Sequence, residues 1–467
     1  MCGIVGYAGN IETACGKPLE VCLQGLERLE YRGYDSAGVA LTAPGMDKVV
    51  VRKKAGRLKN LVEDIERKPM PLATVGIGHT RWATNGEPSD VNAHPHTSMD
   101  GKVAIIHNGI IENASQLRLD LQAEGYRFAS ATDTEVAAKL LGKIVDKIIA
   151  DEGKPDLFKA VRRMARMLEG AFTILATDCR QPDIVVGARH DSPLVVGLGE
   201  GENFLGSDVA AFVAYTKRAM EVDQDQAVCV SADKVIVADF NGNVVENPKT
   251  YTVDWDASAA EKGGWDSFMD KEIHEDPAAV QRTLLGRFDA NGGITLDEVR
   301  IDEHDFKAID KIIVVACGTA SYAGQVAKYA IEHWVRIPVE IELAHEFRYR
   351  DPILTPRTLV VAISQSGETM DTLMALRHAR EQGSKVLAIC NTQGASIPRE
   401  SDAVLYTHAG PEVAVASTKA FGAQIPAAYL LGLYLAQVKG AMFRDEIHQV
   451  LDSLKDMPRK IQWVLDT

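Results

Sequence analysis

The pattern of apolar and polar positions divides the chain into two halves. In the first 250 residues, short β-rich runs with many glycines outnumber the evident helices. Apolar runs of this length, bounded by turn residues, indicate strands. Strands are predicted at residues 4–5, 39–41, 49–51, 75–77, 103–106, 172–176, 184–186 and 228–237. Sheets covered by a few helices predict a layered α+β or α/β sandwich.

One helix of the first half has a defined start. Thr132 and Glu135 have the spacing of a capping box, and apolar residues follow at helical intervals from Val136 to Ile148. The pattern predicts a helix that begins near Asp133. Asp133 then lies in the first turn, where the helix dipole stabilises a carboxylate.

Beyond about residue 305, short apolar runs alternate with helical stretches. The runs are residues 312–316, 358–363, 385–390 and 403–406, and the helical stretches are residues 322–335, 369–382 and 418–436. This alternation predicts a doubly wound parallel α/β sheet. Turn residues dominate residues 247–264, where we place the boundary. We expect domains at 1–250 and 305–445, a linker and helical lead-in at 251–304, and the start of a second linker at 446–467.

Two loops of the second half combine glycine and hydroxyl residues just before a helix. Residues 364–369 read Ser-Gln-Ser-Gly-Glu-Thr, and residues 317–321 read Cys-Gly-Thr-Ala-Ser. Free N–H groups at a helix N-terminus form an anion site, although serine and threonine are also common helix caps. Three hydroxyls in six residues, with Ser417 and Thr418 further on, exceed what capping needs. No nucleotide-binding motif follows a strand, so we expect a small phosphorylated metabolite.

Charge and composition limit the partners. The chain has 51 Lys+Arg against 65 Asp+Glu, a net charge of −14, and no strong basic patch, so nucleic acid is not expected. A length of 467 residues suggests two to four domains. No apolar run approaches the roughly 18–20 residues of a membrane span, and the start Met-Cys-Gly lacks a basic segment. We expect a cytoplasmic protein without membrane contact.

Seven cysteines, without a C-x-x-C pair, argue against a disulfide framework and a structural zinc site. Cys2 is chemically special, because removal of Met1 would put a nucleophilic thiol and a free α-amine on one residue. His94 and His96 could suggest a metal pair, but Pro95 between them favours a packing role.

Several motifs together resemble a known family. Cys-Gly-Ile-Val-Gly at residues 2–6 resembles the start of class II glutamine amidotransferases. Residues 29–38, 78–84, 92–96, 107–113, 132–135, 317–319, 346–350, 364–369 and 415–421 resemble the glutamine–fructose-6-phosphate aminotransferase (isomerizing) family, the glucosamine-6-phosphate synthases. The resemblance implies an N-terminal nucleophile domain, a four-layer αββα sandwich, followed by the first sugar isomerase (SIS) lobe as the parallel sheet.

The resemblance also assigns roles in a glutaminase. Cys2 would be the nucleophile, with its own α-amine as the base. The Asn108 side chain and the Gly109 backbone would form the oxyanion hole. For glutamine itself, Arg81 would bind the carboxylate and Asp133 the ammonium group. Arg32, Trp82 and Thr84 would line or close the pocket.

In the second half the resemblance implies fructose 6-phosphate as the ligand. The residues around the phosphate would be Ser364, Gln365, Ser366 and Thr369, and those contacting the sugar would be Thr319, Val415 and Ser417. Ammonia would pass from Cys2 to the sugar with Trp82 as the gate. The resemblance implies no cofactor, no metal ion, and a homodimer formed through the isomerase lobes.

The chain departs from the family pattern at two positions. Asn85 stands where the family usually has histidine, and asparagine cannot change charge near neutrality. Ala320 replaces a serine often found in the first phosphate loop, which removes one donor. We expect the glutaminase chemistry to survive the first change, with altered loop closure.

Two alternatives stay open. Amidophosphoribosyltransferase shares the N-terminal domain, but the paired aspartates of a diphosphosugar site do not occur beyond residue 305. A sugar-phosphate-sensing regulator would carry a basic DNA-binding helix pair where Cys2 lies. The family's second isomerase lobe has no counterpart after Ser417, so we expect a truncated synthase. Such a chain should hydrolyse glutamine and bind fructose 6-phosphate weakly without forming glucosamine 6-phosphate.

Overall fold

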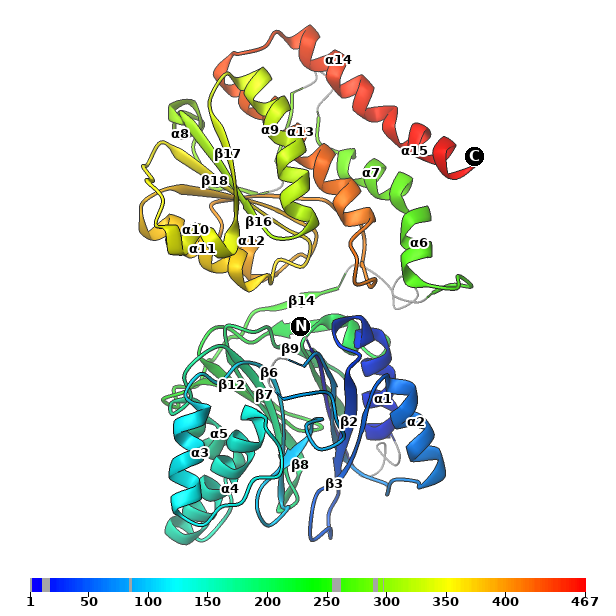
Figure 1. The fold of residues 1–467 in the computed structure, drawn as a ribbon, viewed down its shortest axis with the longest axis vertical. Coiled ribbons are helices and arrows are strands. Elements are labelled where there is room, and N and C mark those ends of the chain that lie inside the picture. The colour runs from blue at the N-terminus through cyan, green and yellow to red at the C-terminus, as the bar shows by residue number, and fades with distance from the viewer. Residues whose placement is uncertain (1, 11–16, 84–85, 254–261, 289–292, 297) are drawn as a thin grey trace. The chain divides into compact units, whose positions relative to one another are not determined.

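The computed structural model describes residues 2–10, 17–83, 86–253, 262–288, 293–296 and 298–467. Its internal contacts divide the chain into two compact units, unit 1 (Met1–Ala260) and unit 2 (Glu261–Thr467) (Figure 1). Each unit contains its own sheets and helices. The finer domain limits given above stay predictions.

Unit 1 contains two antiparallel sheets. The eight-stranded sheet has the order β14-β11-β9-β10-β1-β4-β2-β3. Its strands are β1 (Gly3–Gly9), β2 (Ser36–Thr42), β3 (Val50–Ala55), β4 (Val75–Arg81), β9 (Val195–Leu198), β10 (Glu202–Gly206), β11 (Arg218–Glu221) and β14 (Thr250–Thr252). The six-stranded sheet has the order β13-β12-β8-β7-β6-β5. Its strands are β5 (His96–Thr97), β6 (Val103–Gly109), β7 (Phe172–Asp178), β8 (Gln181–His190), β12 (Gln226–Val230) and β13 (Val235–Asp239).

Helices cover the outer faces of both sheets. They are α1 (Lys17–Leu29), α2 (Leu58–Arg67), α3 (Ala114–Ala123), α4 (Asp133–Glu152) and α5 (Leu157–Ala165), with short helices η1 (Glu30–Arg32) and η2 (Val209–Ala211). Side chains alternate between the faces of a strand, so Ile4 packs between the sheets while its neighbour Val5 packs under α1. Likewise Ile106 faces the other sheet and Ile105 faces α4. Unit 1 is therefore the four-layer αββα sandwich that the resemblance implied.

Two local predictions meet different outcomes. Helix α4 begins at Asp133 as predicted, and the Thr132 hydroxyl accepts a hydrogen bond from the Glu135 backbone. The Glu135 carboxylate accepts from Ala129 and Ser130 instead of closing the capping box. The predicted strand at 228–237 is wrong as one element, because a turn at residues 231–234 separates β12 from β13.

Unit 2 contains one six-stranded sheet with the order β15-β20-β19-β18-β16-β17. Its strands are β15 (Glu298–Val299), β16 (Lys311–Ala316), β17 (Val339–Leu343), β18 (Thr358–Ser364), β19 (Lys385–Cys390) and β20 (Ala403–Tyr406). All neighbouring pairs are parallel except β15 with β20. Helices flank the sheet: α6 (Phe268–His274), α7 (Asp276–Leu284), α8 (Glu303–Ala308), α9 (Thr319–Val335), α10 (Ala344–Arg350), α11 (Met370–Glu381), α12 (Ser396–Glu400), α13 (Lys419–Lys439), α14 (Arg444–Lys455) and α15 (Met457–Leu465).

The strand order reverses direction at β16. From β16 the chain crosses through α9 to β17 on one side, and then through α10 to β18 on the other side. Adjacent crossovers of opposite sense leave a crevice at the carboxyl ends of the strands, where doubly wound sheets bind ligands. Cys317 follows β16 and Ser364 ends β18, and the register pairs Ala316 with Ile363. The two hydroxyl loops therefore lie side by side at this crevice, in the predicted doubly wound sheet.

The remaining edge of the sheet is formed by β17. Its sequence alternates apolar Val339, Ile341 and Leu343 with Glu340 and Glu342, and it pairs only with β16 among the strands that the structure describes. Lys311 forms an ion pair with Glu340 at 3.0 Å.

Helix α13 corrects one expectation. By length and composition it could cross a membrane, although no segment was expected to reach that size. However, 61% of its apolar window is buried inside unit 2, where Leu430 and Leu433 belong to the main core. Burial of this kind is typical of the core helix of a folded domain.

Candidate active site

The first candidate site lies where the core between the two sheets of unit 1 changes from apolar to polar side chains. Ile77 of β4 and Ile106 of β6 belong to this core. Two positions further along each strand, on the same face, are His79 and Asn108. Cys2 has the same relation to Ile4 of β1. Three neighbouring strands thus direct a thiol, an imidazole and an amide into one region.

Cys2 is held by backbone groups of the neighbouring segments. Its sulfur accepts a hydrogen bond from the Trp82 backbone N–H at 3.1 Å. Its carbonyl oxygen accepts from Nδ2 of Asn108 at 2.8 Å. Burial raises the pKa of the Cys2 thiol, and the Trp82 hydrogen bond acts in the opposite direction. The thiol is therefore protonated near neutrality and needs an adjacent base to become a nucleophile.

His79 fixes the orientation of the Asn108 amide. Its Nε2 atom lies 3.1 Å from Oδ1 of Asn108 and 3.0 Å from the carbonyl oxygen of His107. Both partners are acceptors, so Nε2 carries the hydrogen and donates. Burial lowers the pKa of His79 to about 3, so the ring is neutral near neutral pH. With Oδ1 held by His79, Nδ2 of Asn108 points toward Cys2.

Four buried histidines surround this arrangement. The rings of His79 and His94 lie 4.3 Å apart, and His94 also contacts His96 and His107. His96 contacts the Thr132 hydroxyl at 3.0 Å. Burial lowers the pKa of His94 and His96. The predicted pair at 94 and 96 thus packs in a cluster of neutral rings.

Arg81 and Asp133 lie near the thiol. Burial lowers the pKa of Arg81, and Cys2, Asp133 and Asp35 act against this shift through their charges. Asp133 accepts a hydrogen bond from the Ile111 backbone at 3.0 Å. Its carboxylate is only 7% exposed, so a ligand ammonium group would reach one edge of it.

Other predicted residues of this site differ in position. Trp82 is 41% exposed and contacts Tyr34 edge-on. Gly109 ends β6 with a φ of +117°, and a Cβ there would lie 2.0 Å from the Ala171 carbonyl oxygen. Only glycine fits at this position.

Arg32 pairs with Asp208 at 2.7 Å, an anchor within the fold. Thr84 and Asn85 lie outside the described residues.

Asp35 was not singled out from the sequence although it shapes this site. Its carboxylate accepts a hydrogen bond from the Ala83 backbone at 2.8 Å and so holds the segment after Trp82. The Asp35 backbone N–H also donates to the Arg81 carbonyl oxygen. Its place inside the motif at 29–38 was the available signal.

The second candidate site is the loop between β18 and α11. The Ser364 hydroxyl lies 2.9 Å from that of Thr369 and accepts from the Gly367 backbone at 3.0 Å. The Ser366 hydroxyl accepts from the Glu368 backbone at 3.2 Å. Thr369 occupies the N-cap position of α11 but makes no side-chain cap bond. Helix capping therefore does not explain these hydroxyls, and Gln365 lies among them half-buried.

The predicted sugar contacts lie in two other loops. Thr319 is exposed in the first turn of α9, whose N-cap, Gly318, provides no side-chain cap. Val415 is 62% exposed, whereas the hydroxyl oxygens of Ser417 and Thr418 are buried and have no hydrogen-bond partner in the described part of the chain. Among the described residues, no hydrogen bond or ion pair joins Val415 or Ser417 to the loop at 364–369.

Helix α6 contributes a buried acid that the sequence did not suggest. The Glu272 carboxylate accepts from the Val413 backbone at 2.5 Å and is only 1% exposed. Burial raises its pKa to about 7, and the nearby Glu412 adds to the shift while Lys419 opposes it. Lys419 itself is paired with Glu275. This network fixes the segment that carries Val415 and Ser417.

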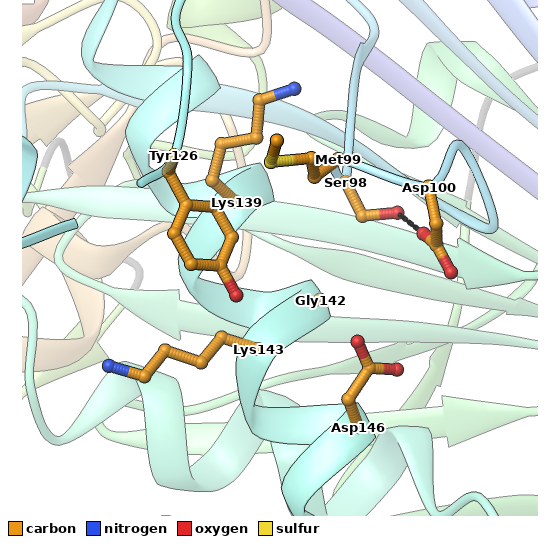
Figure 2. Close-up of a pocket in the computed structure, with 8 residues that line it drawn as sticks. All are labelled: Ser98, Met99, Asp100, Tyr126, Lys139, Gly142, Lys143 and Asp146. Carbon is orange, nitrogen blue, oxygen red and sulfur yellow. Dashed lines mark hydrogen bonds between the residues drawn. The ribbon is translucent and has the colours of Figure 1, made fainter. Parts of the chain in front are cut away.

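A separate pocket of about 390 Å³ lies beside α4 in unit 1 (Figure 2). Its lining residues are Ser98, Met99, Asp100, Tyr126, Lys139, Gly142, Lys143 and Asp146. None of them is a predicted site residue. Lys143 is paired with Glu124 at 2.5 Å, and Lys139 lies 3.7 Å from Glu135, so both cations have partners in the fold.

Comparisons with known proteins agree with the division of the chain into unit 1 and unit 2. The family described as "Glutamine amidotransferase domain" matches residues 79–214, and the family described as "SIS domain" matches residues 306–434. Proteins named glutamine--fructose-6-phosphate aminotransferase [isomerizing] match the whole chain. The one from Corynebacterium diphtheriae is 61% identical over 468 residues, which is 100% of this chain and 74% of that protein. Those from Streptomyces coelicolor and Mycobacterium tuberculosis are 58% and 53% identical with the same coverage.

Among solved structures, the C-terminal domain of glucosamine-fructose-6-phosphate aminotransferase from Francisella tularensis is 40% identical, with a TM-score of 0.41. That match covers 43% of this chain and 56% of the other. The sequence matches that cover the whole of this chain, together with the two matching domains, identify the family. The chain belongs to the glutamine–fructose-6-phosphate aminotransferase (isomerizing) family.

Proposed function

We propose that unit 1 hydrolyses glutamine at Cys2 and that unit 2 binds fructose 6-phosphate, the sugar to which the family transfers the ammonia. The observation that carries the proposal is the Asn108 amide, which His79 orients toward Cys2. One hydrogen of Nδ2 already donates to the Cys2 carbonyl, and the second remains for the oxyanion of the tetrahedral intermediate.

The mechanism begins with a proton transfer. Removal of Met1 frees the α-amine of Cys2, which takes the thiol proton because burial keeps the thiol protonated. The thiolate then attacks the amide carbon of glutamine. Asn108 Nδ2 and the Gly109 backbone N–H stabilise the negative oxygen. The protonated amine returns the proton to the leaving nitrogen, ammonia departs, and water hydrolyses the thioester.

Substrate binding follows from charge. Arg81 offers a planar fork to the α-carboxylate of glutamine, and Asp133 offers a carboxylate to the α-ammonium group. Both are buried near Cys2, where low dielectric strengthens these interactions. Trp82 is placed to cover the bound glutamine, since its backbone contacts the Cys2 sulfur while its ring is half-exposed.

An electrophilic glutamine analogue tests the glutaminase. It should label Cys2 in a chain whose intact mass shows that Met1 is removed. Cys2→Ala should abolish both labelling and glutamate formation, whereas Cys229→Ala, in a strand of the second sheet, should retain both. Undiminished labelling of Cys2→Ala would refute the assignment of the nucleophile.

In unit 2 we propose that Ser364, Gln365, Ser366 and Thr369 hold the phosphate, with Thr319, Val415 and Ser417 on the sugar. Support comes from the place of the loop at the carboxyl ends of β16 and β18, where the strand order reverses. The hydroxyls bond within the loop and do not cap α11, so they and the first turn of α11, which receives no side-chain cap from Thr369, are available to an anion.

Calorimetric titration with fructose 6-phosphate tests this site. Ser366→Ala with Thr369→Val should weaken binding at least about 10-fold, since each lost hydrogen bond to a charged group contributes roughly 1.5 kcal/mol or more. Ser384→Ala, which removes a hydroxyl bonded to the Thr355 carbonyl outside the loop, is the control and should bind normally. Unchanged affinity of the double variant would show that the loop does not bind the phosphate. A diphosphosugar that bound in preference would favour amidophosphoribosyltransferase chemistry.

The wider assembly is also a proposal. We propose a cytoplasmic homodimer without nucleic-acid or membrane partners, supported by the family and by the net charge of −14. Light scattering coupled to gel filtration should give twice the chain mass of 50.8 kDa.

A further inference from the structure

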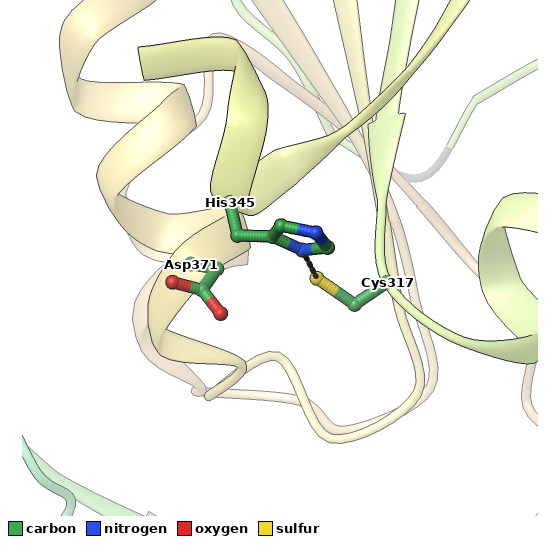
Figure 3. A group of neighbouring side chains, drawn as sticks. All are labelled: Cys317, His345 and Asp371. Carbon is green, nitrogen blue, oxygen red and sulfur yellow. Dashed lines mark hydrogen bonds between the residues drawn. The ribbon is translucent and has the colours of Figure 1, made fainter. Parts of the chain in front are cut away.

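Three side chains from different elements converge at the carboxyl edge of the sheet in unit 2 (Figure 3). Cys317 directly follows β16, His345 is the second residue of α10, and Asp371 is the second residue of α11. One sulfur, one ring nitrogen and one carboxylate oxygen all lie within 4.8 Å of one another. The Cys317 sulfur and Nδ1 of His345 are 4.0 Å apart. None of the three is among the predicted site residues.

These are the three ligand types that zinc takes in proteins. Zinc binds cysteine sulfur at about 2.3 Å and histidine nitrogen at about 2.0 Å, which in a tetrahedral site puts the two atoms roughly 3.6 Å apart. The sulfur and nitrogen here would approach each other by only about 0.4 Å on binding. Three protein ligands leave one position open for water or for another ligand.

The surroundings prepare two of the ligands. The ring of His345 presents Nδ1 to the Cys317 sulfur, and its Nε2 lies 3.8 Å from a carboxylate oxygen of Glu346. The Cys317 sulfur is half-buried, and the backbone N–H groups of Ala344 and His345 favour its thiolate. Burial has the larger effect and raises the pKa of Cys317, so metal binding must release the thiol proton to solvent.

We propose that Cys317, His345 and Asp371 bind a thiophilic divalent cation, with Zn²⁺ as the best fit, and that the bound ion hinders the sugar phosphate. The second part rests on the proposed function of unit 2. Its support is the register of β16 with β18, which puts Cys317 next to Ser364 on neighbouring parallel strands. Strands at this spacing are about 4.8 Å apart. A hydrated cation there would occupy space that the ligand of the loop at 364–369 needs.

Cobalt is the probe for the metal site, because a cobalt–thiolate bond gives a charge-transfer absorption that other ligands do not. The experiment uses the full chain with Cys2→Ala, which removes the other candidate thiol ligand. One equivalent of Co²⁺ should produce the band with release of the thiol proton, and Zn²⁺ should displace the Co²⁺ and abolish the band. Cys317→Ser should abolish the band, and His345→Ala and Asp371→Asn should each weaken Co²⁺ binding at least 10-fold.

Matched controls separate the site from general effects. His304→Ala removes a histidine that is 93% exposed, and Cys229→Ser removes a thiol of unit 1; both should leave the band unchanged. No charge-transfer band in the starting chain, or an unchanged band in Cys317→Ser, would refute the metal site. Circular dichroism verifies that each variant is folded.

The effect on the sugar phosphate has its own measurement. Saturating Zn²⁺ should weaken fructose 6-phosphate binding at least 10-fold in the starting chain and should have no effect in His345→Ala. Unchanged fructose 6-phosphate affinity in the presence of bound Zn²⁺ would refute the hindrance and leave the metal site standing. Failure of fructose 6-phosphate to bind without any metal would instead refute the proposed function of unit 2.

Discussion

At the residue scale, the site in unit 1 depends on neutral histidine chemistry. His79 donates one hydrogen to two acceptors, and its low pKa keeps this donor role constant over the working pH range. A charged ring between the sheets would be costly, because burial strongly disfavours the protonated form. We therefore regard His79 as a positioning residue that acts through Asn108.

His79→Ala should lower kcat of glutamine hydrolysis roughly 10- to 100-fold, with KM for glutamine changed by less than about threefold. The physical reason is that a misoriented Asn108 loses part of an oxyanion contribution of ~10²- to 10³-fold. Steady-state kinetics of His79→Ala, Asn108→Ala and the double variant form the test. The double variant should be no slower than Asn108→Ala. Additive losses would contradict the idea that His79 acts through Asn108.

Gly109 allows a comparison of backbone strain with steric clash. Gly109→Ala would combine a positive φ with a Cβ 2.0 Å from the Ala171 carbonyl oxygen, so we expect a loss of roughly 2–4 kcal/mol in unfolding free energy. Gly125 is the matched control, since its φ is +92° but nothing lies within 4 Å of its Cβ position. Gly125→Ala should cost about 1 kcal/mol. Urea unfolding measures both, and equal losses would contradict the clash.

At the element scale, the sequence predicted the features that depend on residues close together in the chain. The buried strands β16, β18, β19 and β20 were predicted because each is a continuous apolar run. Strand β17 was missed because Glu340 and Glu342 interrupt its apolar residues. The pairing of Arg32 with Asp208, 176 positions away, has no local signal at all. The candidate sites were predicted as motifs. The role of His79 became visible only in the structure, because its partners Asn108 and His107 belong to the facing sheet.

Helix α6 should make the stability of unit 2 depend on pH. Burial raises the pKa of Glu272 to about 7 from 4.5, so the folded chain holds this proton more tightly than the unfolded chain. The stabilisation is present below pH 4.5 and is lost as the pH rises to about 7. Glu272→Gln removes the titration, and the glutamine oxygen can still accept from Val413.

Thermal unfolding of unit 2 between pH 5 and pH 8 measures the effect. Relative to the original chain, Glu272→Gln should gain roughly 2 kcal/mol at pH 8 over its value at pH 5. Glu346→Gln, an exposed carboxylate, is the control and should follow the original chain. A difference that does not change with pH would contradict the raised pKa.

At the scale of the whole molecule, the two units have separate cores and separate proposed ligands. We expect calorimetry to resolve two unfolding transitions. Fructose 6-phosphate at 100 times its Kd should stabilise unit 2 by about 2.7 kcal/mol and raise the Tm of one transition by about 5–10 °C. A covalent glutamine analogue on Cys2 should shift only the other transition. A single transition that both ligands shift equally would contradict independent unfolding of the units.

The edge strand β17 has a consequence for solubility. A strand with one unpaired side can recruit a strand from another molecule, which is how many sheet proteins begin to aggregate. In β17 the alternation of apolar residues places Glu340 and Glu342 on this edge, where they form ion pairs with Lys311 and Arg350. A second copy that approached edge to edge would remove these ion-paired side chains from water, which is costly for charged groups. The desolvation cost of these charged side chains thus protects unit 2 against self-association during expression and storage, at a position where apolar residues would extend the sheet from one molecule to the next.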